Sequence, residues 1–283
     1  MILVKTVKEL QTELRSLKKS GTIGFVPTMG ALHTGHISLV EKAMVENQLV
    51  VVSIFVNPTQ FNDPKDLEKY PRTLETDLKL LEPSGCHLVF APNANEVYPE
   101  PDSRTFNFGT LETVMEGKHR PGHFNGVAQV VSKLFDMVLP DKAYFGLKDF
   151  QQLAIIKKMV EMLDLKIEIV PCEIIRENTG LAKSSRNELL TAEERENAAI
   201  IYATLAEAKE LMQQKSVYEI RKWVIDTINK NPFLTVEYFE IVDDMHLQPV
   251  KNWDEKNIKV GCIAVFCGKV RLIDNIVFNT IES

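Results

Sequence analysis

Two histidines three residues apart, His33 and His36, are the side chains of this chain best placed to do chemistry. They lie within the stretch GFVPTMGALHTGHISLV, residues 24–40. The start of the stretch is short, apolar and rich in β-branched residues, as in a buried strand, and Pro27 ends the strand because proline has no N–H to donate. Beyond His36 the apolar residues recur at helical spacing. The two imidazoles therefore stand where a strand passes into a helix.

This position predicts an anion-binding site. The first turn of a helix has unpaired N–H groups and carries about half a positive charge. Gly30 and Gly35 let a phosphate come close to the backbone, and two imidazoles on one turn can donate further hydrogen bonds to it. The alternative, a helix cap beside a structural histidine, explains the histidines alone. Strand, proline, glycines and helix start together favour a nucleoside-triphosphate site.

A second predicted strand, LVVVSIF at 49–55, is apolar throughout, which is typical of a parallel strand buried on both faces. It leads into NPTQF, so Asn57 and Gln60 stand at its carboxyl end, the edge at which open α/β sheets bind ligands. Their amides can hydrogen-bond a small polar substrate. An Asn-Pro turn is also a common structural feature, and the residues alone leave both interpretations open.

A later strand, predicted at 142–145, leads into GLKDFQQL. Lys148 lies at this junction, where it is either an ordinary exposed lysine or, beside the first anion site, a phosphate ligand. Asp149 can cap the helix that follows. Gln151 and Gln152 point about 100° apart on that helix, so we expect one of them to face the site.

Two further segments have the composition of polyanion-binding loops. KSSR at 183–186 carries two cations and two hydroxyls. GKHRPGHFNGV at 117–127 places His119, Arg120 and His123 near another helix start. Solvated turns of the same composition are common, so neither segment is specific by itself.

The apolar pattern predicts two domains. Residues 1–175 begin with an apolar strand-like segment and an amphipathic helix through residue 19, and then alternate strands and helices. This order predicts an α/β, Rossmann-like, doubly wound parallel sheet. Residues 176–283 read as a smaller α+β lid domain that carries the KSSR loop. The other expected elements are helices at 74–81, from about 124, and at 150–164, 191–214 and 216–229, and strands at 87–91, 166–170, 235–242, 258–266 and 270–277. Thr191 and Glu194 have the spacing of a capping box.

The composition excludes several classes of protein. The 283 residues are 45% hydrophobic and 25% charged, with a net charge of −6, which argues against a broad nucleic-acid surface. No apolar run approaches the roughly 20 residues of a membrane span. The first residues lack the features of a signal peptide, so we expect a cytoplasmic protein. None of the four cysteines forms a CxxC pair, which favours small buried thiols over a zinc site.

The candidate residues limit the reaction type. There is no GxSxG elbow, no cysteine near the two histidines and no GxxxxGK[ST] phosphate loop. What remains is in-line attack by a bound anion on phosphorus, with catalysis by positioning and charge stabilisation.

Four of these motifs, in this order, resemble the pantothenate synthetase family of the HxGH nucleotidyltransferase superfamily: PTMGALHTGH, NPTQF, FGLKDFQQ and KSSRN. The resemblance spans the chain and implies an ATP-dependent ligase that joins pantoate to β-alanine through pantoyl adenylate. It implies ATP and Mg²⁺, a homodimer, and no nucleic-acid or membrane partner. In this family the position of Lys183 is usually methionine, which makes Lys183 a weaker candidate than its neighbours.

The resemblance also implies roles for individual residues. His33, His36 and Lys148 are implied to be catalytic, and Asp149 is the one candidate protein contact for Mg²⁺. The positions implied to bind ATP are Met29, Gly30, Ala31, Leu32, His33, Thr34, Gly35, His36, Gly146, Leu147, Lys148, Asp149, Ile175, Lys183, Ser184, Ser185 and Arg186. Those implied to bind pantoate are Gln60, Gln152, Asn57 and Met29.

Three other functions remain open on the sequence. One is a related nucleotidyltransferase that releases the nucleotidyl product itself. Another is an inactive nucleotide-binding protein with the same sheet. The third, a fragment of a class I aminoacyl-tRNA synthetase, is disfavoured by the acidic charge balance and the short second domain.

Overall fold

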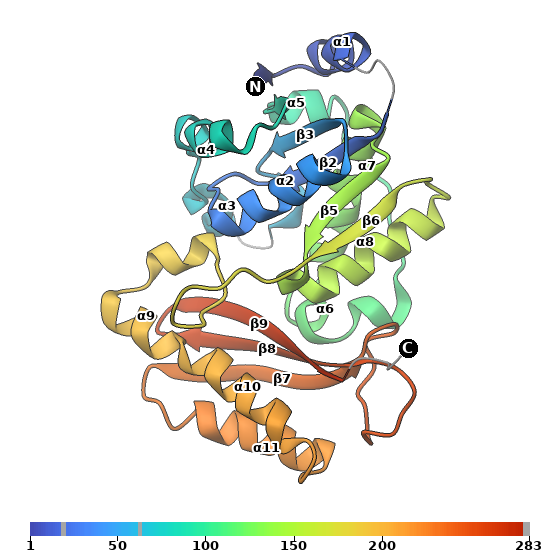
Figure 1. The fold of residues 1–283 in the computed structure, drawn as a ribbon. Coiled ribbons are helices and arrows are strands. Elements are labelled where there is room, and N and C mark those ends of the chain that lie inside the picture. Colours follow the sequence, from blue (N-terminus) through green and yellow to red (C-terminus); the bar gives the residue numbers. More distant parts are fainter. Residues whose placement is uncertain (18–20, 62–63, 280–283) are drawn as a thin grey trace. The chain divides into compact units, whose positions relative to one another are not determined.

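The computed structural model describes residues 1–17, 21–61 and 64–279 (Figure 1). The chain divides into two compact units, each assembled from separate segments. Unit 1 consists of Met1–Phe108, Arg120–Leu147 and Gln152–Glu173. Unit 2 consists of Gly109–His119, Lys148–Gln151 and Ile174–Ser283.

Unit 1 contains a six-stranded parallel sheet in the order β1-β4-β3-β2-β5-β6. The strands are β1 (Ile2–Val4), β2 (Ile23–Thr28), β3 (Leu49–Ile54), β4 (Leu88–Phe90), β5 (Lys142–Gly146) and β6 (Glu168–Cys172). Its helices are α1 (Val7–Leu17), α2 (Thr34–Glu46), α3 (Pro64–Lys69), α4 (Leu74–Leu81), α5 (Ala94–Val97), α7 (His123–Val138) and most of α8 (Phe150–Met162). The expected Rossmann-like, doubly wound sheet is confirmed.

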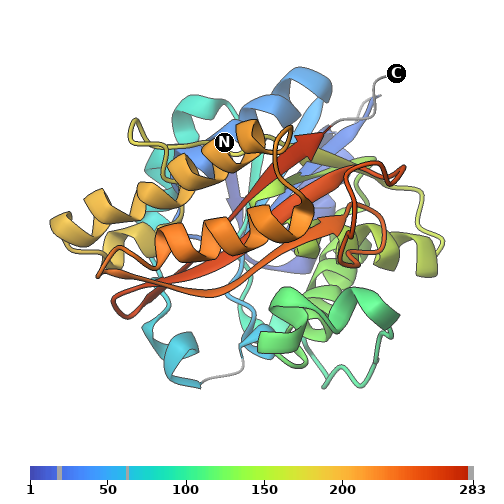
Figure 2. The same ribbon diagram turned by 90° about the horizontal axis from the view of Figure 1, so that it is seen from below.

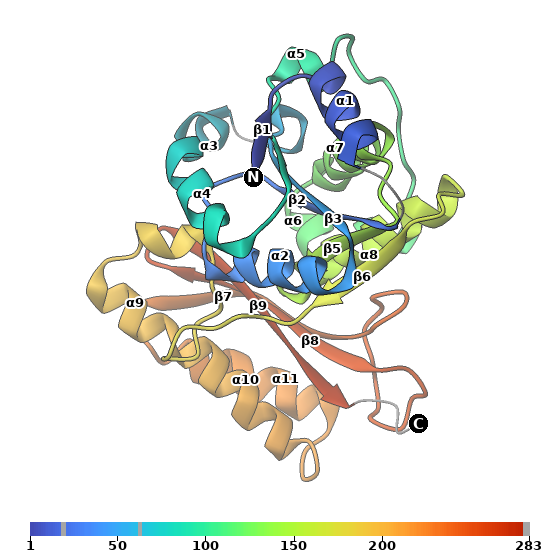
Figure 3. The ribbon, with the colours of Figure 1, turned by 45° about the horizontal axis from the view of Figure 1, so that its top comes forward.

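Helices cover both faces of this sheet, which is why its inner strands β2, β3 and β4 are almost entirely buried. Val26 of β2 packs with Val40 and Ala43 of α2 in one core cluster. The next residue back, Phe25, points to the opposite face and meets Phe135 of α7 edge-on, with ring centroids 6.2 Å apart. Figure 3 shows α2 along one face of the sheet and α7 along the other.

Unit 2 is built on a three-stranded antiparallel sheet, β7 (Leu234–Asp243), β8 (Lys259–Cys267) and β9 (Val270–Asn279), in that order. Its helices are α6 (Met115–His119), α9 (Ala192–Ala198), α10 (Ile200–Leu211) and α11 (Val217–Ile228). α10 and α11 lie side by side against the sheet, and Leu205, Ile220 and Phe239 belong to the core between these elements (Figure 2). This α+β arrangement also agrees with the expectation.

Three predicted elements need correction. Pro27 does not end its strand, because β2 continues through Pro27 to Thr28 and both residues pair with β3. The single helix expected at 191–214 is wrong, because it is divided at Ala199, whose N–H bonds back three residues to Glu196 O instead of four. Its capping box is confirmed, since Thr191 and Glu194 exchange hydrogen bonds. The strand expected at 166–170 lies two residues later and includes Pro171. A proline is tolerated there because β6 is an edge strand. Residues 18 and 19 of the expected first helix lie outside the described residues.

All four cysteines are buried and unpaired, as expected of small core thiols. Burial raises the pKa of the Cys172 and Cys267 thiols to about 11, so neither is a nucleophile at neutral pH. Within the residues that the structure describes, no helix is long and apolar enough to cross a bilayer.

His87 makes the parallel sheet sensitive to acid. Its Nδ1 accepts a hydrogen bond from the N–H of Val50 at 3.1 Å, which requires a neutral ring. Burial lowers the pKa of His87 below its ordinary value of 6.5. The neutral ring therefore contributes stability that is fully present above the unfolded pKa and is lost as the pH falls through the folded pKa.

We predict that His87→Asn, whose side-chain oxygen can accept the same bond, loses less thermal stability than the wild type when the pH is lowered from about 7.5 to about 5.5. The measurement is the melting temperature at both pH values. His246→Asn, which replaces a mostly exposed histidine, is the control and should behave as wild type. Equal losses in wild type and His87→Asn would contradict the prediction.

Candidate active site

The strand order places one candidate site at the carboxyl end of β2. β3 and β4 follow β2 on one side, and β5 and β6 follow on the other. Open α/β sheets bind ligands at this reversal of strand order, outside the carboxyl ends of the strands. The turn 29–33 from β2 to α2 emerges there, and so does Gly146 at the end of β5.

His33 and His36 cap α2 with their own rings. His33 Nδ1 accepts from Gly35 N at 3.1 Å, and His36 Nδ1 accepts from His33 N at 3.2 Å. The ring centroids are 4.0 Å apart. Because each Nδ1 is an acceptor, the proton of each neutral ring is on Nε2, the nitrogen that can donate to a phosphate oxygen. The rings can therefore both cap the helix, through Nδ1, and donate to an anion, through Nε2.

The amides of the turn itself are already bonded within the protein. Gly30 N donates to Thr28 Oγ1 at 3.2 Å. Ala31 N and Leu32 N donate to the two carboxylate oxygens of Asp77 on α4, at 3.1 and 2.8 Å. The sequence analysis missed Asp77. A signal was present, since Asp77 replaces an apolar residue in the stripe of LETDLKLL that packs on the core.

Gln60 lies beside this turn in a short 3₁₀ helix, η1 (Pro58–Gln60). Its Nε2 donates to the sulfur of Met29 at 3.0 Å, and sulfur is a weak acceptor that a substrate oxygen can replace. Asn57, by contrast, is 1% exposed and fully bonded. Its Nδ2 donates to Gln60 Oε1 and Gly126 O, and its Oδ1 accepts from the hydroxyl of Tyr98. Asn57 holds Gln60 in place, and its own contact with a substrate stays a prediction.

In the predicted cluster of His119, Arg120 and His123, the two histidines each contact residues of their own unit. His123 is buried, and its Nδ1 is 2.9 Å from the carbonyl oxygen of Gln60. In unit 2, His119 stacks on Tyr238 and lies 3.4 Å from a Glu237 oxygen. Both histidines therefore have partners within the protein.

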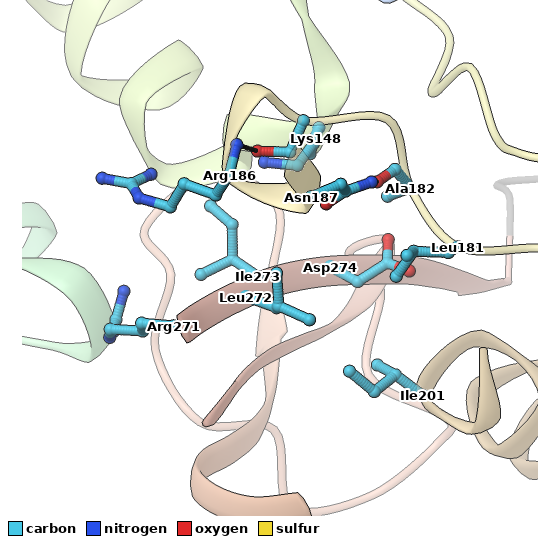
Figure 4. Close-up of a pocket in the computed structure, with 11 residues that line it drawn as sticks. Lys148, Leu181, Ala182, Arg186, Asn187, Ile201, Arg271, Leu272, Ile273 and Asp274 are labelled. Carbon is cyan, nitrogen blue, oxygen red and sulfur yellow. Dashed lines mark hydrogen bonds between the residues drawn. The ribbon is translucent and has the colours of Figure 1, made fainter. Parts of the chain in front are cut away.

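In unit 2, a small cavity brings Lys148 together with the KSSR loop (Figure 4). Lys148 and Arg186 line it on one side and residues 271–274 of β9 on the other, and Ser184 is also among its lining residues. Lys148 belongs to η4 (Leu147–Asp149), and its carbonyl accepts from the side chain of Asn275 at 3.0 Å. Lys148 and the KSSR loop therefore line one cavity inside unit 2, and the placement of Lys148 beside the first anion site stays a prediction.

The cations around this cavity differ in whether a carboxylate already neutralises them. Arg271 bonds both Glu116 and Glu237. In the described part of the chain no ion pair involves Lys148 or Arg186, which leaves their charges for a ligand.

Lys183, in contrast, lies 4.0 Å from Glu177. Glu177 also receives two bonds from Arg195 and one from Asn187, and the bond from Arg195 keeps the pKa of Glu177 below its ordinary value. This carboxylate fixes the two ends of the loop. Lys183 thus has a carboxylate neighbour, whereas the described residues give Arg186 none, and the weaker candidacy of Lys183 as a phosphate ligand stays a prediction.

The remaining candidates are placed as follows. Ile175 O accepts from Lys183 N at 2.9 Å, so Ile175 runs beside the start of the loop. Ser184 Oγ accepts from Arg186 N and begins η5 (Ser185–Leu189). Gln151 is buried and bonds the backbone at Leu111, Val114 and Glu116, whereas Gln152 is half-buried. Of the two glutamines, Gln151 is therefore structural.

Magnesium would find few protein ligands here. Among the described residues, no group of three or more His, Cys, Asp or Glu side chains could hold a metal ion. Asp149 is exposed and is not part of a cluster of potential metal ligands among the described residues. These residues fit a cation that arrives bound to phosphate oxygens and water, which is the usual state of Mg²⁺ with a nucleotide.

Comparison with known proteins identifies the family. Residues 2–277 match the family model of pantoate-beta-alanine ligase. The chain belongs to the pantoate-beta-alanine ligase family. A pantothenate synthetase of Bacteroides thetaiotaomicron is 56% identical over 282 residues, which cover 99% of this chain and 100% of the relative. One from Bacteroides fragilis is 58% identical over 277 residues, 98% of each chain.

Solved structures of the ligase family share the fold. A Thermus thermophilus pantothenate synthetase has a TM-score of 0.92 and 42% identity, and the match covers 99% of this chain and 100% of that one. A Francisella tularensis pantoate-beta-alanine ligase, complexed with β-γ ATP and β-alanine, has a TM-score of 0.83 and 37% identity, with 100% of both chains covered. The resemblance to the ligase family inferred from four motifs is confirmed.

Gly126 allows α7 to approach η1 closely, and a Cβ at this position would overlap the carbonyl group of Thr59 and lie 2.8 Å from Gln60 Cα. We predict that Gly126→Ala is destabilised by about 1–3 kcal/mol through overpacking. Denaturant unfolding measures this. Helix propensity alone predicts the opposite sign, a gain of about 0.5–1 kcal/mol, so a more stable variant would contradict the packing argument.

Proposed function

We propose that this protein condenses pantoate with β-alanine to form pantothenate, with ATP converted to AMP and pyrophosphate and pantoyl adenylate as the intermediate. The observation that carries the proposal is the family match over residues 2–277. The two candidate groups of residues add chemical support, since they offer imidazole and cationic donors and no nucleophile.

In the first step, a carboxylate oxygen of pantoate attacks the α-phosphorus of ATP. The new P–O bond forms as the bond to the bridging oxygen breaks, and pyrophosphate leaves with its added charge. His33 and His36 donate from Nε2, and Lys148 and Arg186 supply positive charge that no carboxylate of the described residues neutralises. Donors aimed at developing charge contribute about 3 kcal/mol each in water-excluded sites. The attacking carboxylate has no proton to give up, so His36 serves as a donor and not as a base in this step.

In the second step, the amine of β-alanine attacks the carbonyl carbon of the adenylate. The C–N bond forms, the C–O bond to AMP breaks, and the amine loses a proton. Gln60 and Gln152 are proposed to hold the hydroxyls and carboxylate of pantoate, with Met29 and Asn57 beside them. Holding the anhydride in position converts this attack into a reaction of oriented groups, which is worth several orders of magnitude in rate.

The residues proposed to bind the nucleotide are those that the family motifs imply, namely 29–36, 146–149, Ile175 and 183–186. Because the N–H groups of Gly30, Ala31 and Leu32 are bonded internally, these residues serve as a surface and not as amide donors. Mg²⁺ is proposed to enter with ATP, with Asp149 as its nearest protein carboxylate. A cytoplasmic homodimer is proposed from the family resemblance, and light scattering after gel filtration tests its mass.

The deciding experiment is ATP–pyrophosphate exchange with and without pantoate, followed by β-alanine. The proposal expects exchange only with pantoate, and release of AMP only after β-alanine is added. Exchange without pantoate, or AMP release without β-alanine, would indicate another nucleotidyltransferase. No exchange under any condition would indicate a protein that binds nucleotide without turnover.

Lys148→Ala is predicted to lose at least about 100-fold in the rate of adenylate formation while it stays folded. Lys183→Met is the matched control in the adjacent loop, and because Lys183 already faces Glu177 we expect a change of less than about threefold. Pre-steady-state release of pyrophosphate measures both. A larger effect at Lys183 than at Lys148 would reverse the assignment.

Gln60→Ala is predicted to raise the KM for pantoate by about tenfold or more and to change the KM for ATP far less, since a buried donor to the substrate is lost. Steady-state kinetics with each substrate varied in turn measure the two constants. Equal changes in both would contradict the placement of Gln60.

A further inference from the structure

Asp77 is a buried carboxylate that the proposed reaction does not use. It is 2% exposed and lies on the core side of α4. Charged side chains are seldom buried so completely unless they are paired. No described lysine, arginine or histidine forms an ion pair with Asp77. Its partners are three neutral donors, the amides of Ala31 and Leu32 and the hydroxyl of Thr73.

The backbone that Asp77 binds has an unusual conformation. Gly30 has φ +80° and Ala31 has φ +49°, so two successive residues are left-handed and one of them has a side chain. Such a residue is strained unless its surroundings hold it. Successive amides in turns of this type converge into a concave anion-binding site. In this protein the carboxylate of Asp77 occupies that concavity.

The turn leads directly to the catalytic candidates. Leu32, whose amide is bonded at 2.8 Å, immediately precedes His33, the cap of α2. The capping geometry of His33 and His36 therefore begins at a backbone fixed by Asp77. A Cβ on Gly30 would be 3.0 Å from an Asp77 oxygen, so the negative charge is adjacent to the turn. The negative charge of Asp77 would repel a phosphate from the amides of Ala31 and Leu32, so a phosphate would bind at the imidazole rings of His33 and His36 instead.

We propose that Asp77 is a positioning residue, an internal anion that holds the turn at residues 30–32 so that His33 and His36 present their Nε2 atoms to the triphosphate. The geometry from which we infer this role lies within unit 1. The kinetic test of the role rests on the proposed function. The role predicts that a free small carboxylate can replace the missing side chain.

The test uses the full chain with Asp77→Ala, with Glu75→Ala as control because Glu75 is exposed on the same helix. We expect Asp77→Ala to lose about 100-fold in adenylate formation, the cost of a misplacement of order 1 Å, with a larger rise in the KM for ATP than in that for pantoate. Sodium formate, which fits the vacated site, should restore about fivefold or more by mass action, whereas sodium chloride should not. Neither wild type nor Glu75→Ala should respond to formate.

A second readout needs no activity. Formate should raise the melting temperature of Asp77→Ala and leave that of the wild type unchanged, because only the variant has a vacant site. If Asp77→Ala does not fold, Asp77→Asn keeps the volume but leaves one amide facing an NH₂ group. It should show the same selective rise in the KM for ATP.

The outcomes separate the two proposals. If the wild type shows no pantoate-dependent exchange, the proposed function fails, while the formate-dependent melting shift still tests the role of Asp77. If the wild type is active and a folded Asp77 variant keeps an ATP KM within about twofold of it, this inference is wrong. A folded, impaired Asp77→Ala variant that ignores formate in both assays would also overturn it, since the loss would then come from packing alone.

Discussion

The hydrogen bonds that the carboxylate of Asp77 accepts from the amides of the β2–α2 turn are the interaction on which we propose that unit 1's candidate site depends. The turn must leave a buried strand, reverse direction through two left-handed residues and start a helix whose first two functional side chains are histidines. Backbone amides in such a turn need acceptors. Thr28, Asp77 and the two imidazoles supply them, so the local fold and the presentation of the rings have the same cause.

In unit 2, carboxylates again fix the local structure, but their partners are cationic side chains and not backbone amides. Carboxylates neutralise the cations that shape the loop and the sheet, such as Arg195 at Glu177 and Arg271 at Glu116. The loop that carries Ser184 and Arg186 is fixed by Asn187, which bonds both Glu177 and the carbonyl of Ala182. Lys148 and Arg186 have no such carboxylate among the described residues. Arg195 and Arg271 are thus neutralised by carboxylates of the protein, whereas the charges of Lys148 and Arg186 can be neutralised by a ligand.

Much of the fold followed from sequence because the signals were local. The strand predicted at 49–55 is the buried strand β3, Leu49–Ile54, and the capping box at Thr191 begins a helix. The division at Ala199 was not predictable, since it depends on one hydrogen bond that shifts from four residues back to three. The extension of β6 through Pro171 was not predicted, because a proline is tolerated there at a sheet edge and the edge position is set by the whole sheet.

The candidate site also has residues that the sequence predicts and residues that it does not. Histidines, lysine and the KSSR loop were found because their residue types and spacing are distinctive. Their supports were missed because Asp77, Glu177 and Asn275 act through partners 10 to 127 residues away in the chain, and only the folded structure shows such pairings.

A crystal structure with a non-hydrolysable ATP analogue and pantoate tests this account most directly. The account predicts that phosphate oxygens lie within hydrogen-bond distance of the Nε2 atoms of His33 and His36 and of the side chains of Lys148 and Arg186, with Asp77 still bonded to Ala31 and Leu32. Phosphates bound instead to the amides of residues 30–32, with Asp77 displaced, would contradict it.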